Sequence, residues 1–379
     1  MKLIKPFIAL TLILCLSISA SAQNEKAASD IQEIMKKFEV VGLSVAVVKK
    51  GEIIYNESFG LKDNTSNEPL KNDHIFRIAS ISKSFSATSI MQLVEAGKLN
   101  LDDDISDLIG FTVRNPNFPD KKITLKMLMS HTSSINDSQG YFTLDAINPS
   151  KNPDWEKCFS KYAPGTNYQY CNLNYNMIGT VIEKYSGVRF DNYVKNNILK
   201  PLGLYGGYNI DSLDASKFAT LHEYNTKTKT LSPSPLAYST RRDILSNYKM
   251  GYSTPLFSPT GGMKISSGDL AKYMAMHMNF GNYKGVKIIS KKSSRLMQTK
   301  ISEEEGYGLA IANRDDVIPG EMMTGHTGSA YGLYSAMFFN PKEKFGFVVI
   351  TNGCNPNYTN GLNDLLRAGL NSLYNNFIK

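Results

Sequence analysis

The sequence predicts a mixed α/β (α+β) fold, in which one antiparallel sheet is assembled from both ends of the chain and a helical region is inserted between them. Two observations lead to this expectation. Strand-like apolar runs lie near both termini, at residues 43–48 and 53–55 and again at 334–339 and 345–350. Helix-like patterns fill much of the 379-residue chain between them. At roughly 150 residues per domain, a chain of this length is expected to have two or three folding units, and two interleaved regions agree with this length equally well.

The N-terminal elements follow from the spacing of apolar residues. Residues 30–40 are expected to form an amphipathic helix, because apolar side chains recur there every three or four positions. A β-rich run at 43–48 follows, and a turn at 49–52 leads into the second strand at 53–55. These two strands are therefore predicted to form a hairpin.

Five segments in the middle of the chain have helical patterns, namely residues 80–96, 123–131, 174–185, 190–199 and 267–278. Gly97 and Gly187 directly follow two of these segments and are expected to end the helices. Near the C-terminus, the Asn340-Pro341-Lys342 turn separates the last two predicted strands.

The first 22 residues have the pattern of a signal peptide. Two lysines precede an apolar stretch at residues 7–18, and Ala20-Ser21-Ala22 follows it. The stretch is shorter than the about 20 residues needed to cross a bilayer. We therefore expect residues 1–22 to be removed, and the mature chain of residues 23–379 to be soluble and secreted or periplasmic.

The charge and the cysteines argue against several classes of protein. Lys and Arg number 42 against 34 Asp and Glu, but the basic residues are scattered and form no tract of the kind that binds nucleic acid. Cys158, Cys171 and Cys354 are too few for a disulfide framework, and we expect buried thiols, with one bridge and a free thiol as the alternative. No Cys-x-x-Cys or His-Glu-x-x-His pattern indicates a metal site.

Ser80 and Lys83 have the spacing of a nucleophile and its base. Residues three apart share one face of a helix, so Lys83 is expected to reach the Ser80 hydroxyl. A lysine deprotonates a serine only when its pKa, about 10.4 when free, is lowered, and the apolar helix that follows would supply this by burial. Ser246 and Lys249 repeat the spacing without an apolar helix, and we interpret them as a chance match.

Two further polar segments are candidates for the same site. Tyr170-Cys171-Asn172 follows a Pro-Gly turn and precedes a predicted helix. Gly325-His326-Thr327-Gly328-Ser329 is expected just before the strand that starts at Tyr334. Glycines beside a strand allow a substrate to approach the backbone closely and let backbone N–H groups point at it.

The order Ser80-x-x-Lys83, Tyr170-x-Asn172 and His326-Thr327-Gly328 resembles the serine β-lactamase and penicillin-binding-protein family, nearest its class C β-lactamase, D-peptidase and esterase branch. Supporting strings surround these motifs, including Phe76-Arg77-Ile78-Ala79, Leu128-Met129-Ser130-His131-Thr132-Ser133, Pro259-Thr260-Gly261-Gly262 and Gly306-Tyr307-Gly308. The match spans about residues 30–370.

The resemblance implies a β-lactamase-like fold with two regions. An antiparallel sheet flanked by helices would comprise about residues 23–80 and 290–379, and an all-helical region about residues 81–289. The active site would lie in the cleft between the two regions.

The resemblance also implies catalytic roles. Ser80 would become acylated, Lys83 would help to deprotonate it, and Tyr170 would pass the proton to the leaving group and then activate water. Asn172 would hydrogen-bond the substrate amide or Lys83. Neither a metal nor another cofactor is required by this scheme.

The third motif is implied to bind the substrate. His326, Thr327 and Gly328 would line the site, and the N–H groups of Ser80 and Ser329 would form an oxyanion hole, worth about 3 kcal/mol per donor in other acyl-transfer enzymes. Many β-lactam-hydrolysing members have lysine in place of His326. A mostly neutral histidine attracts a substrate carboxylate less, which shifts the expectation from β-lactams to peptides, D-amino-acid amides or esters.

The expected function is therefore that of an exported serine hydrolase. It would act through an acyl-enzyme on a small-molecule or peptide substrate: a D-amino-acid peptide, a peptidoglycan-type peptide, a small ester or a β-lactam. The chain is expected to be a monomer. The alternative is a penicillin-binding or sensor protein of the same fold with little or no turnover.

The other histidines are expected to have structural roles. His131 would end a helix, His277 would lie on an apolar helix, and His74 and His222 would be on the surface. A Ser-His-Asp triad is ranked below the Ser-Lys-Tyr arrangement, because the Gly-x-Ser-x-Gly pattern is absent.

Overall fold

Strands from both ends of the chain form one antiparallel sheet in the computed structural model, which describes residues 5–239, 248–303 and 305–379. In these residues the sheet has seven strands in the order β11-β12-β13-β14-β1-β2-β3. Their bounds are β1 Gly42–Lys49, β2 Glu52–Asp63, β3 Glu68–Pro69, β11 Ala312–Ile318, β12 Glu321–Ala330, β13 Leu333–Asn340 and β14 Phe345–Thr351. Val45 of β1 lies opposite Val349 of β14, which confirms the predicted sheet built from both termini.

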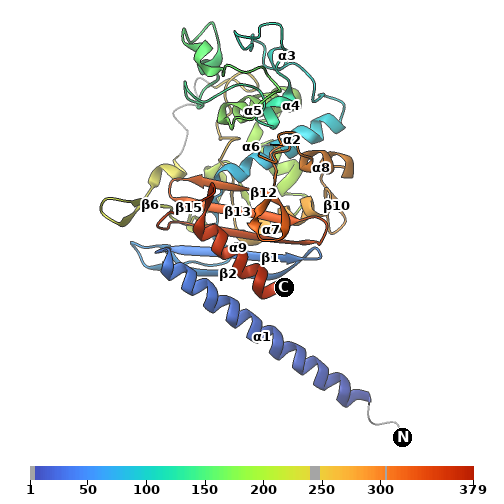
Figure 1. Ribbon diagram of the computed structural model, residues 1–379, viewed down its shortest axis with the longest axis vertical. Helices are drawn as coiled ribbons and strands as arrows, with labels where there is room; N and C mark the ends of the chain where they lie inside the picture. Colours follow the sequence, from blue (N-terminus) through green and yellow to red (C-terminus); the bar gives the residue numbers. More distant parts are fainter. Residues whose placement is uncertain (1–4, 240–247, 304) are drawn as a thin grey trace.

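Helices cover both faces of this sheet (Figure 1). Helices α1 (Lys5–Lys37) and α9 (Asp364–Phe377) lie side by side on one face, and α7 (Ser267–Met278) packs on the other. Successive side chains of a strand point to opposite faces, so β1 contributes to two cores. Leu43, Val45 and Val47 pack with α1 and α9, whereas Ala46 and Val48 belong to the core on the side of α7.

The remaining helices gather on the α7 side of the sheet (Figure 1). They are α2 Ser82–Glu95, α3 Ile105–Ile109, α4 Leu125–Met129, α5 Asn172–Ser186, α6 Phe190–Val194 and α8 Lys291–Gln298, with a π-helical turn at Lys195–Leu199 after α6. Gly187 ends α5 in the left-handed conformation at φ 70°, and Gly97 has φ 69° just after α2. Both predicted helix ends are confirmed, because glycine adopts this conformation without a Cβ penalty.

Short strands connect these larger elements. A three-stranded sheet is formed by β4 (Phe76–Arg77), β8 (Lys264–Ile265) and β5 (Gly206–Gly207). The other short strands pair two by two and are β6 His222–Asn225, β7 Thr230–Pro233, β9 Asn282–Tyr283, β10 Val286–Lys287, β15 Tyr358–Thr359 and β16 Leu362–Asn363. Since β4 ends at Arg77, shortly before Ser80, its pairing with β8 helps to position the predicted nucleophile.

Several element predictions need correction. The segment Gly325–Ser329 precedes β13, as predicted, but it also lies inside a strand of its own, β12, whose pattern is concealed by its polar residues and two glycines. The predicted helix at 123–131 begins later, at Leu125, where the Thr124 side chain caps it. Strand β11 and helix α9 were not predicted at all.

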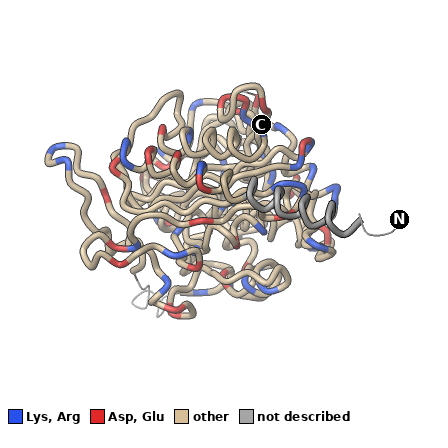
Figure 2. The backbone as a smooth tube through the Cα atoms, turned by 90° about the horizontal axis from the view of Figure 1, so that it is seen from below, with Lys and Arg blue, Asp and Glu red and all other residues tan. Residues whose placement is uncertain are grey.

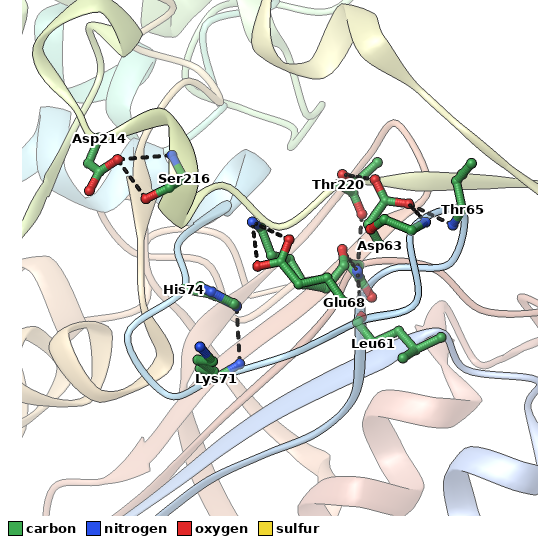
Figure 3. A network of polar contacts seen from close by, with 12 residues as sticks. Leu61, Asp63, Thr65, Glu68, Lys71, His74, Asp214, Ser216 and Thr220 are labelled. Atoms are coloured by element: carbon green, nitrogen blue, oxygen red, sulfur yellow. Dashed lines mark hydrogen bonds and ion pairs between the residues drawn. The ribbon is translucent and has the colours of Figure 1, made fainter.

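His74 and His222 are buried rather than on the surface, so that expectation is wrong. His74 Nδ1 accepts a hydrogen bond from the Lys71 N–H at 3.1 Å, within a polar network beside β2 and β3 (Figure 3). In the same network Asp63 accepts a hydrogen bond from the Thr220 hydroxyl at 2.8 Å. Burial lowers the pKa of both histidines, so at neutral pH they act as uncharged structural groups.

The distribution of charge and the cysteines agree with the sequence. Lys and Arg are interspersed with Asp and Glu over the described backbone (Figure 2). Cys158, Cys171 and Cys354 are buried free thiols, as predicted. Among the described residues, no helix is both long enough and apolar enough to cross a membrane.

Candidate active site

Ser80 lies in a tight turn that joins β4 to α2. It is the middle residue of the 3₁₀ turn Ala79–Ile81, and Ala79 has a left-handed φ of 47°, an uncommon conformation for alanine. A Cβ on Gly328 would lie 2.3 Å from the Ile78 carbonyl oxygen, so only glycine lets β12 approach this turn so closely. The local backbone thus presents Ser80 next to the β12 strand.

Lys83 lies one turn after Ser80 and is fully buried. Its Nζ is 3.1 Å from Ser80 Oγ, which confirms that the predicted spacing brings the two together. Nζ also donates to Asn172 Oδ1 at 3.0 Å and to the Thr260 carbonyl oxygen at 3.1 Å. Burial lowers the pKa of Lys83 to about 7, against the opposing negative charge of Asp137. A large fraction of this lysine is therefore neutral near pH 7.

The ring of Tyr170 packs against the Lys83 amine. Nζ of Lys83 lies 4.7 Å from the centre of the Tyr170 ring. The Tyr170 hydroxyl is buried and makes no hydrogen bond of standard geometry. It is nevertheless near enough to Ser80 that the serine hydroxyl opposes the effect of burial on the pKa of Tyr170. Burial dominates and raises the pKa of Tyr170, so the phenol is protonated at neutral pH.

Asn172 is the first residue of α5, and Asp137 from a preceding loop holds it in place. The Asp137 carboxylate accepts hydrogen bonds from the Asn172 N–H at 2.8 Å, from Asn172 Nδ2 at 2.9 Å and from the Leu173 N–H at 3.0 Å. Such bonds satisfy the free N–H groups at a helix start. The sequence reasoning missed Asp137, because nothing in the local pattern links it to a helix 35 positions later.

His326 on β12 is buried and neutral. Its Nδ1 faces the Thr327 carbonyl oxygen at 2.5 Å, and a carbonyl only accepts, so Nδ1 carries the proton. Nε2 is then the acceptor for the Tyr307 hydroxyl at 3.0 Å. Burial, together with the positive charge of Lys83, lowers the pKa of His326 to about 4. The expectation of a mostly neutral histidine holds here.

The outer edge of β12 is open beside Ser80. Strand β11 begins at Ala312 opposite Gly325, so residues 326–330 pair with a strand on one side only, in β13. A cavity of about 510 Å³ borders this edge, and its lining includes Ser80, Tyr170, Asn172 and Ser329. A smaller cavity of about 150 Å³ lies next to it, shares Tyr170 and contains His326 and Thr327. The structure thus brings Ser80 before α2, Tyr170 and Asn172 at the start of α5, and His326, Thr327 and Ser329 of β12 to two adjoining cavities.

His131 differs from its predicted role. It is fully buried, and its Nδ1 accepts a hydrogen bond from the Cys171 N–H at 3.1 Å instead of meeting carbonyl groups at a helix end. Its ring lies 4.3 Å from that of Tyr170. Burial lowers its pKa well below the usual value, so His131 is a neutral support for the segment that carries Tyr170.

Other predicted features bear less on the site. Ser246 lies outside the described residues, so the second Ser-x-x-Lys spacing has no structural account, while Lys249 is exposed. His277 is buried on α7, as expected. Within the described ranges, no group of three or more His, Cys, Asp or Glu side chains is arranged to hold a metal ion.

Comparisons with known proteins identify the class to which this fold and cleft belong. The family model described as Beta-lactamase matches residues 27–370, and the chain belongs to this family. The resemblance stated from the sequence motifs is thereby confirmed, as is the β-lactamase-like fold class.

Individual relatives are distant. Protein flp of Staphylococcus aureus (strain N315) is 25% identical over an alignment of 340 residues, and the match covers 85% of this chain and 61% of that protein. Penicillin-binding protein 4 of Amycolatopsis lactamdurans is 26% identical, over 83% of this chain and 81% of that protein. Among solved structures, the octameric penicillin-binding protein homologue from Pyrococcus abyssi superposes with a TM-score of 0.72 at 26% identity, over 92% of this chain and 78% of that one. The chain spans about 61% of the length of flp.

Proposed function

We propose that this chain is a serine hydrolase that acts through an acyl-enzyme on an amide or ester, with Ser80 as nucleophile. The observation that carries the proposal is the hydrogen-bond geometry of Lys83. A neutral amine has two N–H donors and one lone pair. Asn172 Oδ1 and the Thr260 carbonyl oxygen are both acceptors and take up the two donors. The lone pair is then left for the Ser80 hydroxyl, 3.1 Å away.

The proposed acylation moves one proton from the nucleophile to the leaving group. Ser80 Oγ attacks the carbonyl carbon while Lys83 takes its proton. Tyr170 is protonated at neutral pH because of its raised pKa, so it gives its proton to the leaving group and regains one from Lys83. The negative charge on the carbonyl oxygen is stabilised by the N–H groups of Ser80 and Ser329. In deacylation, water attacks the acyl group and gives its proton to Tyr170, which passes its own proton to Lys83, and Lys83 returns a proton to Ser80 Oγ as the ester bond breaks.

The charge of the cleft supports a preference among the possible substrates. His326 is neutral and hydrogen-bonded to Tyr307, so it offers no fixed cation to a substrate carboxylate. Arg77 also lines the cavity, and its guanidinium is held by the Gly261 and Ala237 carbonyl oxygens and by the Tyr331 ring. We therefore favour D-amino-acid amides, peptides and small esters over β-lactams as substrates.

A substrate panel tests the proposal. Residues 23–379 are assayed with p-nitrophenyl esters, D-amino-acid amides, D-Ala-D-Ala peptides and a chromogenic cephalosporin, beside the Ser80→Ala variant and Ser66→Ala, an exposed serine outside the cleft, as the matched control. We expect turnover of at least one ester or amide that Ser80→Ala abolishes and Ser66→Ala keeps. A Ser80 adduct without turnover would instead indicate a sensor or penicillin-binding protein.

Export and oligomeric state are separate parts of the proposal. The signal-peptide pattern at residues 1–22 supports secretion or transfer to the periplasm, and the N-terminal sequence of the mature protein tests it. We propose a monomer, whereas the Pyrococcus abyssi homologue is described as octameric. Light scattering coupled to gel filtration distinguishes the two states.

A further inference from the structure

Asp137 carries a partly buried negative charge that forms no ion pair with any described residue. Instead, its carboxylate meets four groups at the start of α5. Oδ2 accepts from the backbone N–H and from Nδ2 of Asn172, while Oδ1 accepts from the Leu173 N–H and lies 3.2 Å from Cys171 Sγ. A carboxylate at a helix start with a side chain among its donors does more than cap the helix.

The contact with Nδ2 fixes which way the Asn172 side chain faces. A carboxylate only accepts hydrogen bonds, so the group that Asn172 turns toward Asp137 must be its NH₂. The opposite end of the same amide, Oδ1, must then face Lys83, and it accepts from Nζ at 3.0 Å. Turning the amide over would place two donors against Lys83 and an oxygen against a negative charge.

This orientation controls where the Lys83 lone pair points. With Oδ1 toward it, neutral Lys83 uses one N–H on Asn172 and the other on the Thr260 carbonyl oxygen. An amide turned over would donate to the lone pair and compete with the Ser80 hydroxyl for it. The contacts thus link the orientation of the Lys83 lone pair, through Asn172, to the Asp137 carboxylate.

We propose that Asp137 is a positioning residue, which fixes the amide of Asn172 and thereby aims the Lys83 lone pair at Ser80. The inference rests on the proposed function and deepens it. A purely structural role as the cap of α5 makes a different prediction, because loss of a cap lowers stability without changing the chemistry of each folded molecule.

Asp137 is also the charged group that acts on Lys83 at neutral pH. The groups facing Lys83 are Tyr170 and Tyr175 from the α5 side, Cys171, Asp137, and the rings of His131 and His326. Burial raises the pKa of both tyrosines and of Cys171 and lowers the pKa of both histidines, so all of these are neutral. Neutralising Asp137 removes a stabilising influence on the ammonium form of Lys83 and lowers its pKa.

The test is the rate at which a fluorophosphonate acylates Ser80, measured across pH 5 to 9 for folded, active-site-titrated protein. This readout works whether or not the enzyme turns over. The variants are Asp137→Asn, Asn172→Ala and the double variant. Asp104→Asn is the control for loss of a helix cap, because Asp104 caps α3 and accepts from the Ser106 N–H at 3.0 Å, where it also pairs with Arg114.

We expect Asp137→Asn to lower the plateau rate by roughly tenfold to a hundredfold, the usual effect of misplacing a reacting group by a fraction of an ångström to one ångström. The midpoint of the rise with pH should move to lower pH. In the Asn172→Ala background, Asp137→Asn should lower the plateau rate by less than a further threefold, because both changes interrupt the same chain of contacts. Asp104→Asn should keep both the plateau and the midpoint.

Two results would overturn the inference. One is an Asp137→Asn variant with an unchanged plateau rate and midpoint per active site, even if its melting temperature falls as in Asp104→Asn. The other is a double variant in which the two single losses multiply. If the wild-type protein is not labelled at Ser80 at all, the proposed function fails as well, so the two failures are distinguishable.

Discussion

The Tyr307 hydroxyl donates a hydrogen bond to Nε2 of His326 at 3.0 Å, and this contact fixes the histidine as a neutral group in the wall of the cleft. Burial and the nearby Lys83 keep the pKa of His326 at about 4, so it does not gain a charge at any pH where the proposed chemistry operates. The site therefore has a polar but uncharged group where many β-lactam-hydrolysing relatives place a cation.

The first prediction concerns this charge. His326→Lys should lower KM for a β-lactam or a peptide with a C-terminal carboxylate and leave KM for a neutral ester nearly unchanged. A partly desolvated contact between a cation and a carboxylate is worth about 1.5 to 3 kcal/mol, or roughly ten- to hundredfold, before the cost of fitting a longer side chain. Parallel kcat/KM measurements on charged and neutral substrates provide the check.

His326→Gln is the matched control, because it keeps a neutral polar side chain. Equal changes for charged and neutral substrates in His326→Lys would contradict carboxylate selection. They would indicate instead that the new cation repels the Lys83 ammonium and lowers its pKa.

The second prediction assigns the nucleophile. A fluorophosphonate or a slow β-lactam should leave its adduct on Ser80, as located by mass spectrometry of peptides. Ser80→Ala should lose roughly 10⁴- to 10⁶-fold in kcat, since no other group replaces the nucleophile. An adduct on Ser246 would show that the other Ser-x-x-Lys spacing carries the chemistry.

The sequence predicted the elements with strong apolar periodicity and missed those held by contacts between distant segments. The predicted helix at 267–278 coincides with α7, and the runs at 43–48 and 345–350 are the centres of β1 and β14. Strand β12 was not predicted, because glycines stand where an ordinary strand has apolar residues. These glycines allow the neighbouring backbone to approach closely.

The same contrast holds within the site. The spacing of Ser80 and Lys83 follows from the geometry of one helical turn, so sequence alone is sufficient. Asp137 and Thr260 reach the Lys83 network only through the tertiary fold. His131 was misassigned because its burial against Tyr170 depends on packing that no local pattern shows.

The third prediction is that Lys83 and Tyr170 form one proton-transfer unit. The Lys83 amine lies over the Tyr170 ring, and both groups are neighbours of Ser80. Lys83→Ala and Tyr170→Phe should each reduce kcat strongly. The kcat of the double variant should be only slightly below that of the less active single variant. If the two losses multiplied, each residue would act independently.

The fourth prediction concerns pH. Ser80 is deprotonated by the neutral form of Lys83, so kcat/KM should rise with pH and reach half of its maximum near pH 7, the pKa to which burial lowers this lysine. Lys83→Arg should be inactive throughout, because a guanidinium stays protonated. His326→Gln should leave the midpoint in place, since His326 titrates near pH 4. If the midpoint moved in His326→Gln, the assignment of this titration to Lys83 would be wrong.

The last prediction tests the close approach of β12 to the Ser80 turn. A Cβ on Gly328 would lie 2.3 Å from the Ile78 carbonyl oxygen, 2.5 Å from Ser335 Oγ and 3.2 Å from the Ala79 Cβ. The Ser335 hydroxyl can rotate away, but the Ile78 carbonyl is part of the backbone and moves only if the turn moves. Gly328→Ala should therefore push the turn away from β12 and misplace Ser80 relative to the open strand edge. A displacement of this size costs roughly a hundredfold in kcat, whereas binding of small esters should change less.

Gly369→Ala on α9 is the matched control, because its added Cβ would meet only the two methyl groups of Val349, at 3.3 and 3.6 Å, on the face of the sheet opposite α7. Kinetics per active site and the melting temperature are measured for both variants. Gly328→Ala should lose kcat by much more than Gly369→Ala even after correction for the folded fraction. Equal kcat in the two variants would mean that the position of Ser80 does not depend on β12.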